Sequence, residues 1–96
     1  MSSAGDWKAL TEAAKDGHLS TVRMYANSGV DLNYQHPEYM TTPLIEAARG
    51  GFVDIVTLLL EHGADPAIKS QFDGKTALEE AEEQGHTKVI QILGGK

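Results

Sequence analysis

The sequence predicts an all-α repeat solenoid in which three helix-turn-helix units are joined by β-hairpin fingers. Three segments align without gaps at a constant offset of 34 residues, beginning at Trp7, Thr41 and Lys75, and self-similarity at such a period is the signature of repeat proteins. Within each segment, apolar residues recur at helical spacing and glycines follow them. We therefore divide the single domain, residues 1–96, into repeats at about 6–39, 40–73 and 74–96.

The first helix of each unit has a sequence signal for its start. In the second unit, Thr42 precedes Pro43, and proline suits the first turn of a helix because its missing N–H would have no partner there. In the third unit, Thr76 and Glu79 have the spacing of a capping box. Small residues at equivalent positions let the first helices approach one another closely; these are Ala13, Ala47 and Ala81.

The second helix of each unit follows a glycine turn. In the second unit this turn is at Gly51, and Ile55, Leu58 and Leu59 then share one helical face. Gly63 is expected to end this helix in a left-handed conformation. Helices this short cannot bury their apolar faces alone, so the units must stack on one another.

Two turn-rich connectors, YQHPEYM at 34–40 and IKSQFDG at 68–74, separate the units. We expect each of them to form a β-hairpin finger. In the second finger, Gly74 supplies a residue that readily adopts positive φ. In the first finger, Met40 stands at the equivalent position and Pro37 lies nearby, so we expect a different turn there.

The composition limits the classes of function. The chain has 96 residues, no cysteine and a net charge of −6. An acidic chain is a poor match for nucleic acid, because phosphate binding relies on Lys and Arg. No apolar stretch approaches the ~20 residues of a membrane helix. We therefore expect a monomer that binds neither nucleic acid nor membrane, and a cytoplasmic protein small enough to enter the nucleus as well.

The chemical motifs give no support for catalysis. Residues 74–76, GKT, match the end of a phosphate-binding loop, but Lys69 stands where that loop requires its first glycine. The four histidines lack metal-ligand spacing; His18 and His86 instead share a turn position with Phe52, which indicates packing. No serine lies in a G-x-S-x-G setting. We predict no enzyme activity, no cofactor and no metal site, and we interpret GKT as a turn followed by a helix cap.

The complete pattern resembles the ankyrin-repeat family. The second unit reads TPLIEAA and later IVTLLLEHGADP, against the family's T-P-L-H-x-A-A opening, and the resemblance extends from about Trp7 to Leu93. Small stand-alone members are nearest in layout. The outer units also carry polar residues at packing positions, as terminal repeats require; these are Thr21, Glu82 and Gln91.

The resemblance implies that a protein partner contacts the fingers and the exposed side of the first helices. Aromatic and arginine side chains contribute a large share of the energy at such interfaces. Packing between fingers is an equal alternative for Tyr34, Tyr39 and Phe72, and Trp7 is expected to cover the open end of the first unit. The predicted partner-binding residues are Tyr34, His36, Glu38, Tyr39, Met40, Thr41, Arg49, Phe72, Asp73 and Lys75.

The resemblance implies that the protein is an adaptor or a steric inhibitor. The sequence does not identify its partner. An alternative is a structural or assembly module that docks a basic partner through acidic residues of the third unit. These residues also have a simpler interpretation, the solvated face of a terminal repeat. They are Glu79, Glu80, Glu82 and Glu83.

Overall fold

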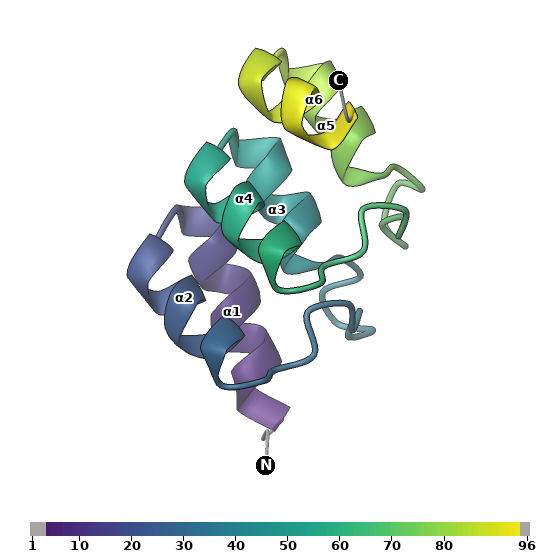
Figure 1. Cartoon of the computed structure of the whole chain (residues 1–96). Helices are drawn as coiled ribbons and strands as arrows, with labels where there is room; N and C mark the ends of the chain where they lie inside the picture. Colours follow the sequence, from purple (N-terminus) through teal and green to yellow (C-terminus); the bar gives the residue numbers. More distant parts are fainter. Residues whose placement is uncertain (1–3, 95–96) are drawn as a thin grey trace.

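The computed structural model describes residues 4–94, which form six helices arranged as three successive pairs. The pairs are α1 (Ala4–Asp16) with α2 (Leu19–Asn27), α3 (Pro43–Gly50) with α4 (Val53–Glu61), and α5 (Ala77–Gln84) with α6 (Thr87–Gly94). Figure 1 shows the pairs stacked in chain order. This stack agrees with the predicted all-α repeat solenoid.

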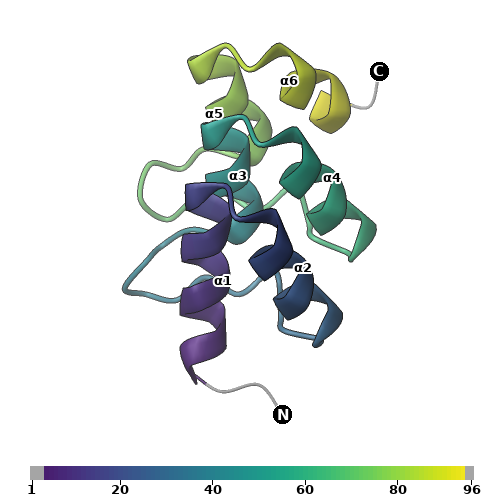
Figure 2. The same ribbon diagram turned by 90° about the vertical axis from the view of Figure 1, so that its left-hand side faces the viewer.

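The helices lie in two rows. The first helices pack together, with α3 between α1 and α5, while α4 lies between α2 and α6 in the second row. Figure 2 shows both rows, and the two connectors project from the row of first helices. The stack measures 35 × 25 × 20 Å. Within residues 4–94, no helix has both the length and the apolar character needed to cross a membrane.

The predicted start signals are confirmed. The Thr42 hydroxyl accepts a hydrogen bond from the backbone N–H of Ile45 at 3.3 Å. Thr76 and Glu79 form the reciprocal capping box, each side chain accepting from the other residue's backbone N–H. The GKT motif is therefore the turn and cap that begin α5.

The core lies between the two rows of helices. Leu44 and Ala47 of α3 face Val56 and Leu59 of α4, and all four are at most 1% exposed. Ala81 of α5 is also fully buried, so small side chains line the contacts between neighbouring first helices. Neither helix of a pair could bury these residues alone, which is why the pairs must stack.

Aromatic rings join successive pairs at their turns. A Cβ built on Gly17 would lie 2.7 Å from the Phe52 ring, and one built on Gly51 would lie 2.6 Å from the His86 ring. The His86 Nε2 is also 2.9 Å from the Arg49 carbonyl oxygen. The predicted packing role of this turn position is thus confirmed for Phe52 and His86. His18 is exposed, because no described pair precedes it.

The connectors differ from the prediction in two respects. No β-strand occurs within residues 4–94, so the expected hairpin form is not shown; each connector is a loop closed by a backbone hydrogen bond. The Met40 N–H donates to the His36 carbonyl at 2.7 Å, and the Gly74 N–H donates to the Ser70 carbonyl at 2.8 Å. Met40 has φ of 57° and Gly74 has φ of 73°. The two turns are therefore equivalent, and the prediction of a different turn at Met40 is wrong.

We call residues 34–41 the first finger and residues 68–75 the second finger. Hydrogen bonds connect the two. The Met40 carbonyl accepts from the Gln71 N–H at 2.9 Å and from the Ser70 hydroxyl at 3.1 Å. The Gln35 side chain donates to the Lys69 carbonyl at 2.9 Å. The fingers therefore stack on each other as the helix pairs do.

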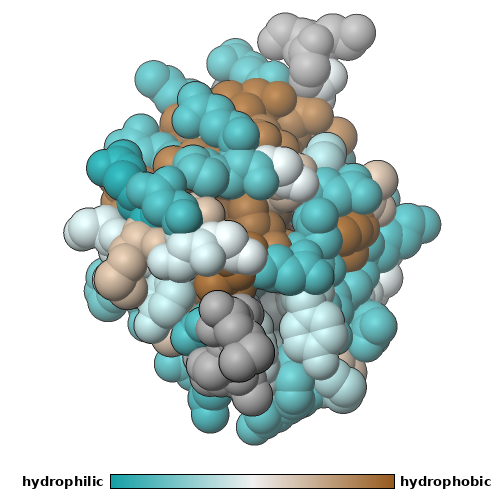
Figure 3. All heavy atoms as spheres, turned by 60° about the horizontal axis from the view of Figure 1, so that its bottom comes forward, coloured by the Kyte–Doolittle hydropathy of each residue, from teal (hydrophilic) through white to brown (hydrophobic). Residues whose placement is uncertain are grey.

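The end of the stack that carries α1 and α2 has a mainly hydrophilic surface. Figure 3, which brings the bottom of Figure 1 forward, shows teal residues over much of this face with separate brown areas between them.

Candidate functional site

The first finger packs on Trp7 of α1. The Trp7 ring stacks on His36 with 3.9 Å between ring centroids and 8° between planes. Tyr39 and Tyr34 approach the same ring edge-on, at 5.0 Å and 6.4 Å. Edge-on and stacked pairs of this kind contribute to stability beyond the area they bury. Trp7 thus supports the first finger, and Tyr34 keeps 46% of its surface exposed.

Tyr39 is also tied to α1 by its hydroxyl, which donates a hydrogen bond to the Glu12 carboxylate. This hydrogen bond is the main reason that the pKa of Tyr39 is raised to about 12; burial and the charges of Glu12 and Glu38 act in the same direction. The structure therefore packs Tyr39 on α1 and not on the other finger, and its contact with a partner stays a prediction.

We expect the Tyr39 hydrogen bond to stabilise the fold at neutral pH and to be lost between pH 10 and 12. The tyrosine pKa is about 10 in an unfolded chain and about 12 in the fold. The contribution is fully present below pH 10 and falls as the pH rises through 12, because the phenolate repels Glu12.

The measurement is the free energy of unfolding of wild type and Tyr39→Phe as a function of pH. Their difference should be constant up to about pH 10 and shrink above it. The tyrosinate absorbance of Glu12→Gln should show Tyr39 ionising at lower pH than in the wild type. An unchanged Tyr39 pKa in that variant would contradict the assignment.

The second finger carries the most exposed large apolar side chain of the described residues. Phe72 is 73% exposed, and its backbone N–H donates to the Ser70 hydroxyl at 3.0 Å. Neighbouring Asp73 is exposed too. The finger turn therefore presents an aromatic ring beside a carboxylate.

Arg49 joins two first helices instead of lying free on the surface. One of its terminal nitrogens donates to both carboxylate oxygens of Glu46 at 2.8 and 2.9 Å, and its other nitrogens donate to Glu80 at 3.1 and 3.3 Å. Glu46 and Glu80 are 7% and 1% exposed. Glu80, and then Glu46, hold the pKa of Arg49 above its ordinary value, although burial opposes them.

Three of the four acidic residues of the third unit are exposed, as the solvated-face interpretation expects; these are Glu79, Glu82 and Glu83. Glu80 is buried against Arg49, which corrects the expectation that all four glutamates are exposed. Glu79 serves in the capping box, and Glu83 forms an ion pair with Lys75. Glu82 is exposed. The surface charge of this unit is therefore smaller than its sequence indicates.

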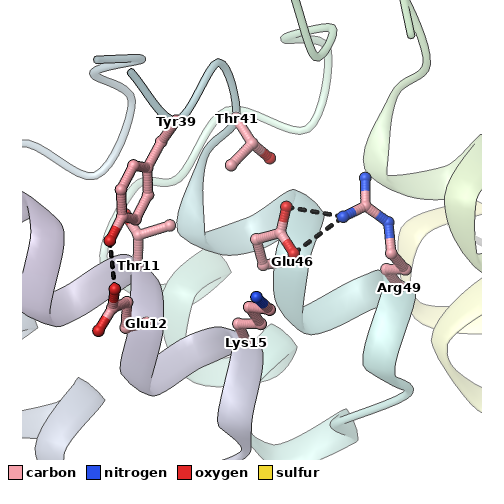
Figure 4. A pocket seen from close by; sticks show the side chains of 7 residues that line it. All are labelled: Thr11, Glu12, Lys15, Tyr39, Thr41, Glu46 and Arg49. Atoms are coloured by element: carbon pink, nitrogen blue, oxygen red, sulfur yellow. Dashed lines mark hydrogen bonds and ion pairs between the residues drawn. The ribbon is translucent and has the colours of Figure 1, made fainter. Parts of the chain in front are cut away.

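A cavity of 390 Å³ lies between the first finger, α1 and α3. Figure 4 shows Tyr39 and Glu12 on one side, Glu46 and Arg49 on the other, and Lys15 extending between them. Its lining residues are Thr11, Glu12, Lys15, Tyr39, Thr41, Glu46 and Arg49.

The predicted site residues fall into three groups. Four are exposed: Tyr34, Glu38, Phe72 and Asp73. Four have side chains in contacts within the chain: His36, Tyr39, Arg49 and Lys75. Two remain, Met40, which is partly buried, and Thr41, which is buried.

Sequence reasoning missed Glu12 and Glu46, although a signal for them exists. Glu12, Glu46 and Glu80 recur at the repeat spacing. An acidic residue repeated at one register position, two of whose copies are buried, indicates a shared structural use. The ion pair of Glu46 with Arg49 has the i,i+3 spacing of a helical pair.

Comparison with known proteins matches residues 5–96 to a family model described as ankyrin repeats, in three copies. The chain is 42% identical over 90 residues to the putative ankyrin repeat protein YahD of Escherichia coli, a match that covers 88% of this chain and 44% of that protein. It is 40% identical over 86 residues to the ankyrin repeat and KH domain-containing protein CBG24701 of Caenorhabditis briggsae, covering 88% of this chain and 3% of that protein. It is 34% identical over 86 residues to human ARF GTPase-activating protein GIT1, a match that covers 90% of this chain and 11% of that protein. The chain spans less than half the length of each of these relatives.

Proposed function

Because the chain belongs to the ankyrin-repeat family, whose repeats generally mediate protein–protein interaction, we propose that it is an adaptor or steric inhibitor. It binds a protein partner through its two fingers and the exposed side of its first helices, without catalysis. Its mechanism is to cover a surface of the partner, so shape and charge decide which partner is bound.

The exposure of Phe72 is the observation that supports this proposal most directly. The Phe72 side chain is 73% exposed at the turn of the second finger. Both fingers project from the row of first helices, so Phe72 and the half-exposed Tyr34 belong to the same side of the stack. When a partner covers an aromatic side chain that folding leaves in water, the free energy of the complex is lowered.

We expect Phe72→Ala with Tyr34→Ala to weaken partner binding at least tenfold, because truncating an aromatic anchor typically costs about 2 kcal/mol or more. These positions test the surface more cleanly than Tyr39, whose hydroxyl also holds the first finger to α1. The measurement is calorimetric titration of a partner isolated by affinity capture on the wild-type chain.

The matched control is Met24→Ala. Met24 is 53% exposed but lies on α2, in the row of helices away from the fingers. This variant should bind as the wild type does. Unchanged affinity of the finger double variant, with its unfolding temperature intact, would rule out a finger-centred interface.

A further inference from the structure

The first helices carry a ladder of alternating charges at the repeat spacing. Glu12, Glu46 and Glu80 occupy one register position. Three residues later, Lys15 and Arg49 occupy a second position, where the third unit has Glu83. Between α3 and α5 the ladder is closed, since the Arg49 guanidinium contacts the carboxylates of both Glu46 and Glu80 within 3.3 Å.

Between α1 and α3 the same ladder is open. Lys15 stands where Arg49 stands one repeat later, but it forms no ion pair or hydrogen bond within residues 4–94. The 390 Å³ cavity occupies this gap. Figure 4 shows the Lys15 ammonium extending toward the space between Glu12 and Glu46. The fold thus repeats the two carboxylates without repeating the guanidinium that joins them.

We propose that this cavity binds the guanidinium of an arginine side chain from the protein partner. The arginine bridges Glu12 and Glu46 as Arg49 bridges Glu46 and Glu80. This inference rests on the proposed function, and it names the chemistry of the partner group at the surface described above.

The acceptors needed for such a guanidinium are in place. One oxygen of Glu12 accepts from Tyr39, which leaves the other oxygen available. Each oxygen of Glu46 accepts one hydrogen bond from Arg49, and a carboxylate has about four acceptor sites in all. A planar guanidinium with five N–H donors suits two separate carboxylates better than a compact ammonium does.

The remaining walls fit the same ligand. The Tyr39 ring lines the cavity, and a guanidinium packs favourably on an aromatic face. Thr41 is 7% exposed, and its hydroxyl oxygen is the one buried side-chain polar atom without a hydrogen-bond partner among the described residues. A buried polar atom left unpaired is costly, and an entering N–H donor would satisfy it.

Charge favours a cation over an anion. The cavity lining holds Glu12 and Glu46 against Lys15 and Arg49, and Glu80, which also pairs with Arg49, adds one negative charge beside it. Glu46 is buried, so its field is screened by water less than that of a surface group. An acidic side chain entering the cavity would meet two carboxylates, with Lys15 as its only unpaired cation.

The direct test is an NMR titration of the isotope-labelled full chain with three capped tripeptides, Gly-Xaa-Gly, in which Xaa is arginine, citrulline or glutamate. Arginine should give saturable shifts at the amides of Glu12, Thr41 and Glu46. Citrulline, which has the same shape without the charge, should bind at least five times more weakly, and glutamate should not saturate. Absence of saturation by arginine, or equal binding of citrulline, would overturn the proposal.

Substitutions at Lys15 test whether the cavity binds a guanidinium. Lys15→Arg supplies the missing guanidinium from within the chain, so it should raise the unfolding temperature and reduce arginine-peptide affinity about fivefold or more. Lys15→Ala removes a competing cation and should increase that affinity about twofold to threefold. The control is Lys8→Ala, which removes an equal, exposed charge from α1 outside the cavity lining. Weaker arginine binding in Lys15→Ala, or no change in Lys15→Arg, would contradict the bridge.

The two proposals fail separately. If arginine peptides do not bind but Phe72-dependent capture persists, the surface binds a partner without an arginine in this cavity. If the peptides bind and Lys15→Arg blocks them while the finger double variant captures partners normally, the cavity assignment holds and the finger-centred interface is wrong.

Discussion

Arg49→Met is expected to lower the free energy of unfolding by about 3 kcal/mol. The substitution removes the cation that pairs with Glu46 and Glu80. Both carboxylates then stay buried without a partner charge, since these residues are only 7% and 1% exposed. Breaking a buried ion pair by removing one partner typically costs about 3–5 kcal/mol. We take the low end of that range because the Arg49 side chain is 34% exposed and water screens part of its charge.

Chemical denaturation measures this loss, and Lys75→Met is the matched control. Lys75 pairs with Glu83 at side-chain exposures of 35% and 52%, and exposed pairs of this kind contribute little to stability because water and salt screen them. In the Arg49→Met background, adding Glu46→Met and Glu80→Met should recover most of the lost stability, because buried ion networks can often be replaced by apolar side chains. If Arg49→Met costs no more than Lys75→Met, the network between α3 and α5 is not a stabilising bridge.

The second large effect is expected from Gly51→Ala, at about 3 kcal/mol of destabilisation. Gly51 has φ of 77°, and its added Cβ would lie 2.6 Å from the His86 ring. A left-handed conformation costs a residue with a Cβ about 1–2 kcal/mol, and overfilling a packed contact typically costs about 1–3 kcal/mol more. The ring would also be moved away from the Arg49 carbonyl oxygen.

Gly85→Ala separates these two costs. Gly85 has φ of 73°, close to that of Gly51, but nothing lies within 4 Å of an added Cβ. Its substitution should therefore cost only the backbone strain, about 1–2 kcal/mol. In a His86→Ala background, Gly51→Ala should cost the same small amount. Equal losses for Gly51→Ala and Gly85→Ala in the wild-type chain would show that the contact between pairs is unimportant.

Local and repeated features of the fold were predictable from the sequence. Thr42, Thr76 and Glu79 were identified as caps because capping depends on residues three apart. The stacking of helix pairs follows from short amphipathic helices that recur at a constant spacing. Phe52 and His86 were identified as packing residues because they share one position in the repeat.

Contacts that depend on the geometry between repeats were not predictable. Tyr39 and Glu12 are 27 residues apart, and Arg49 and Glu80 are 31 apart. Propensity and helical periodicity say nothing about which side chains meet at such separations. Arg49 was predicted as a partner contact, yet the next first helix lies close enough for Glu80 to form an ion pair with it.

The turn at Met40 shows a different limit. Glycine is the usual residue at positive φ because it has no Cβ, so methionine there indicated another turn. The first finger adopts the left-handed conformation all the same, with the Met40 carbonyl accepting hydrogen bonds from Gln71 and Ser70. Tertiary hydrogen bonds outweigh the local preference of one residue.

At the turns of the second and third helix pairs, a ring packs on the glycine of the preceding helix pair, and this contact gives the stack a direction. Each pair offers a ring toward its predecessor and a bare glycine toward its successor, as Phe52 and Gly51 do. Two such surfaces are complementary but not identical, so two molecules meeting end to end through them would associate head to tail. Such an arrangement has no twofold axis and does not close at two copies. A symmetric dimer of this chain would have to use some other face.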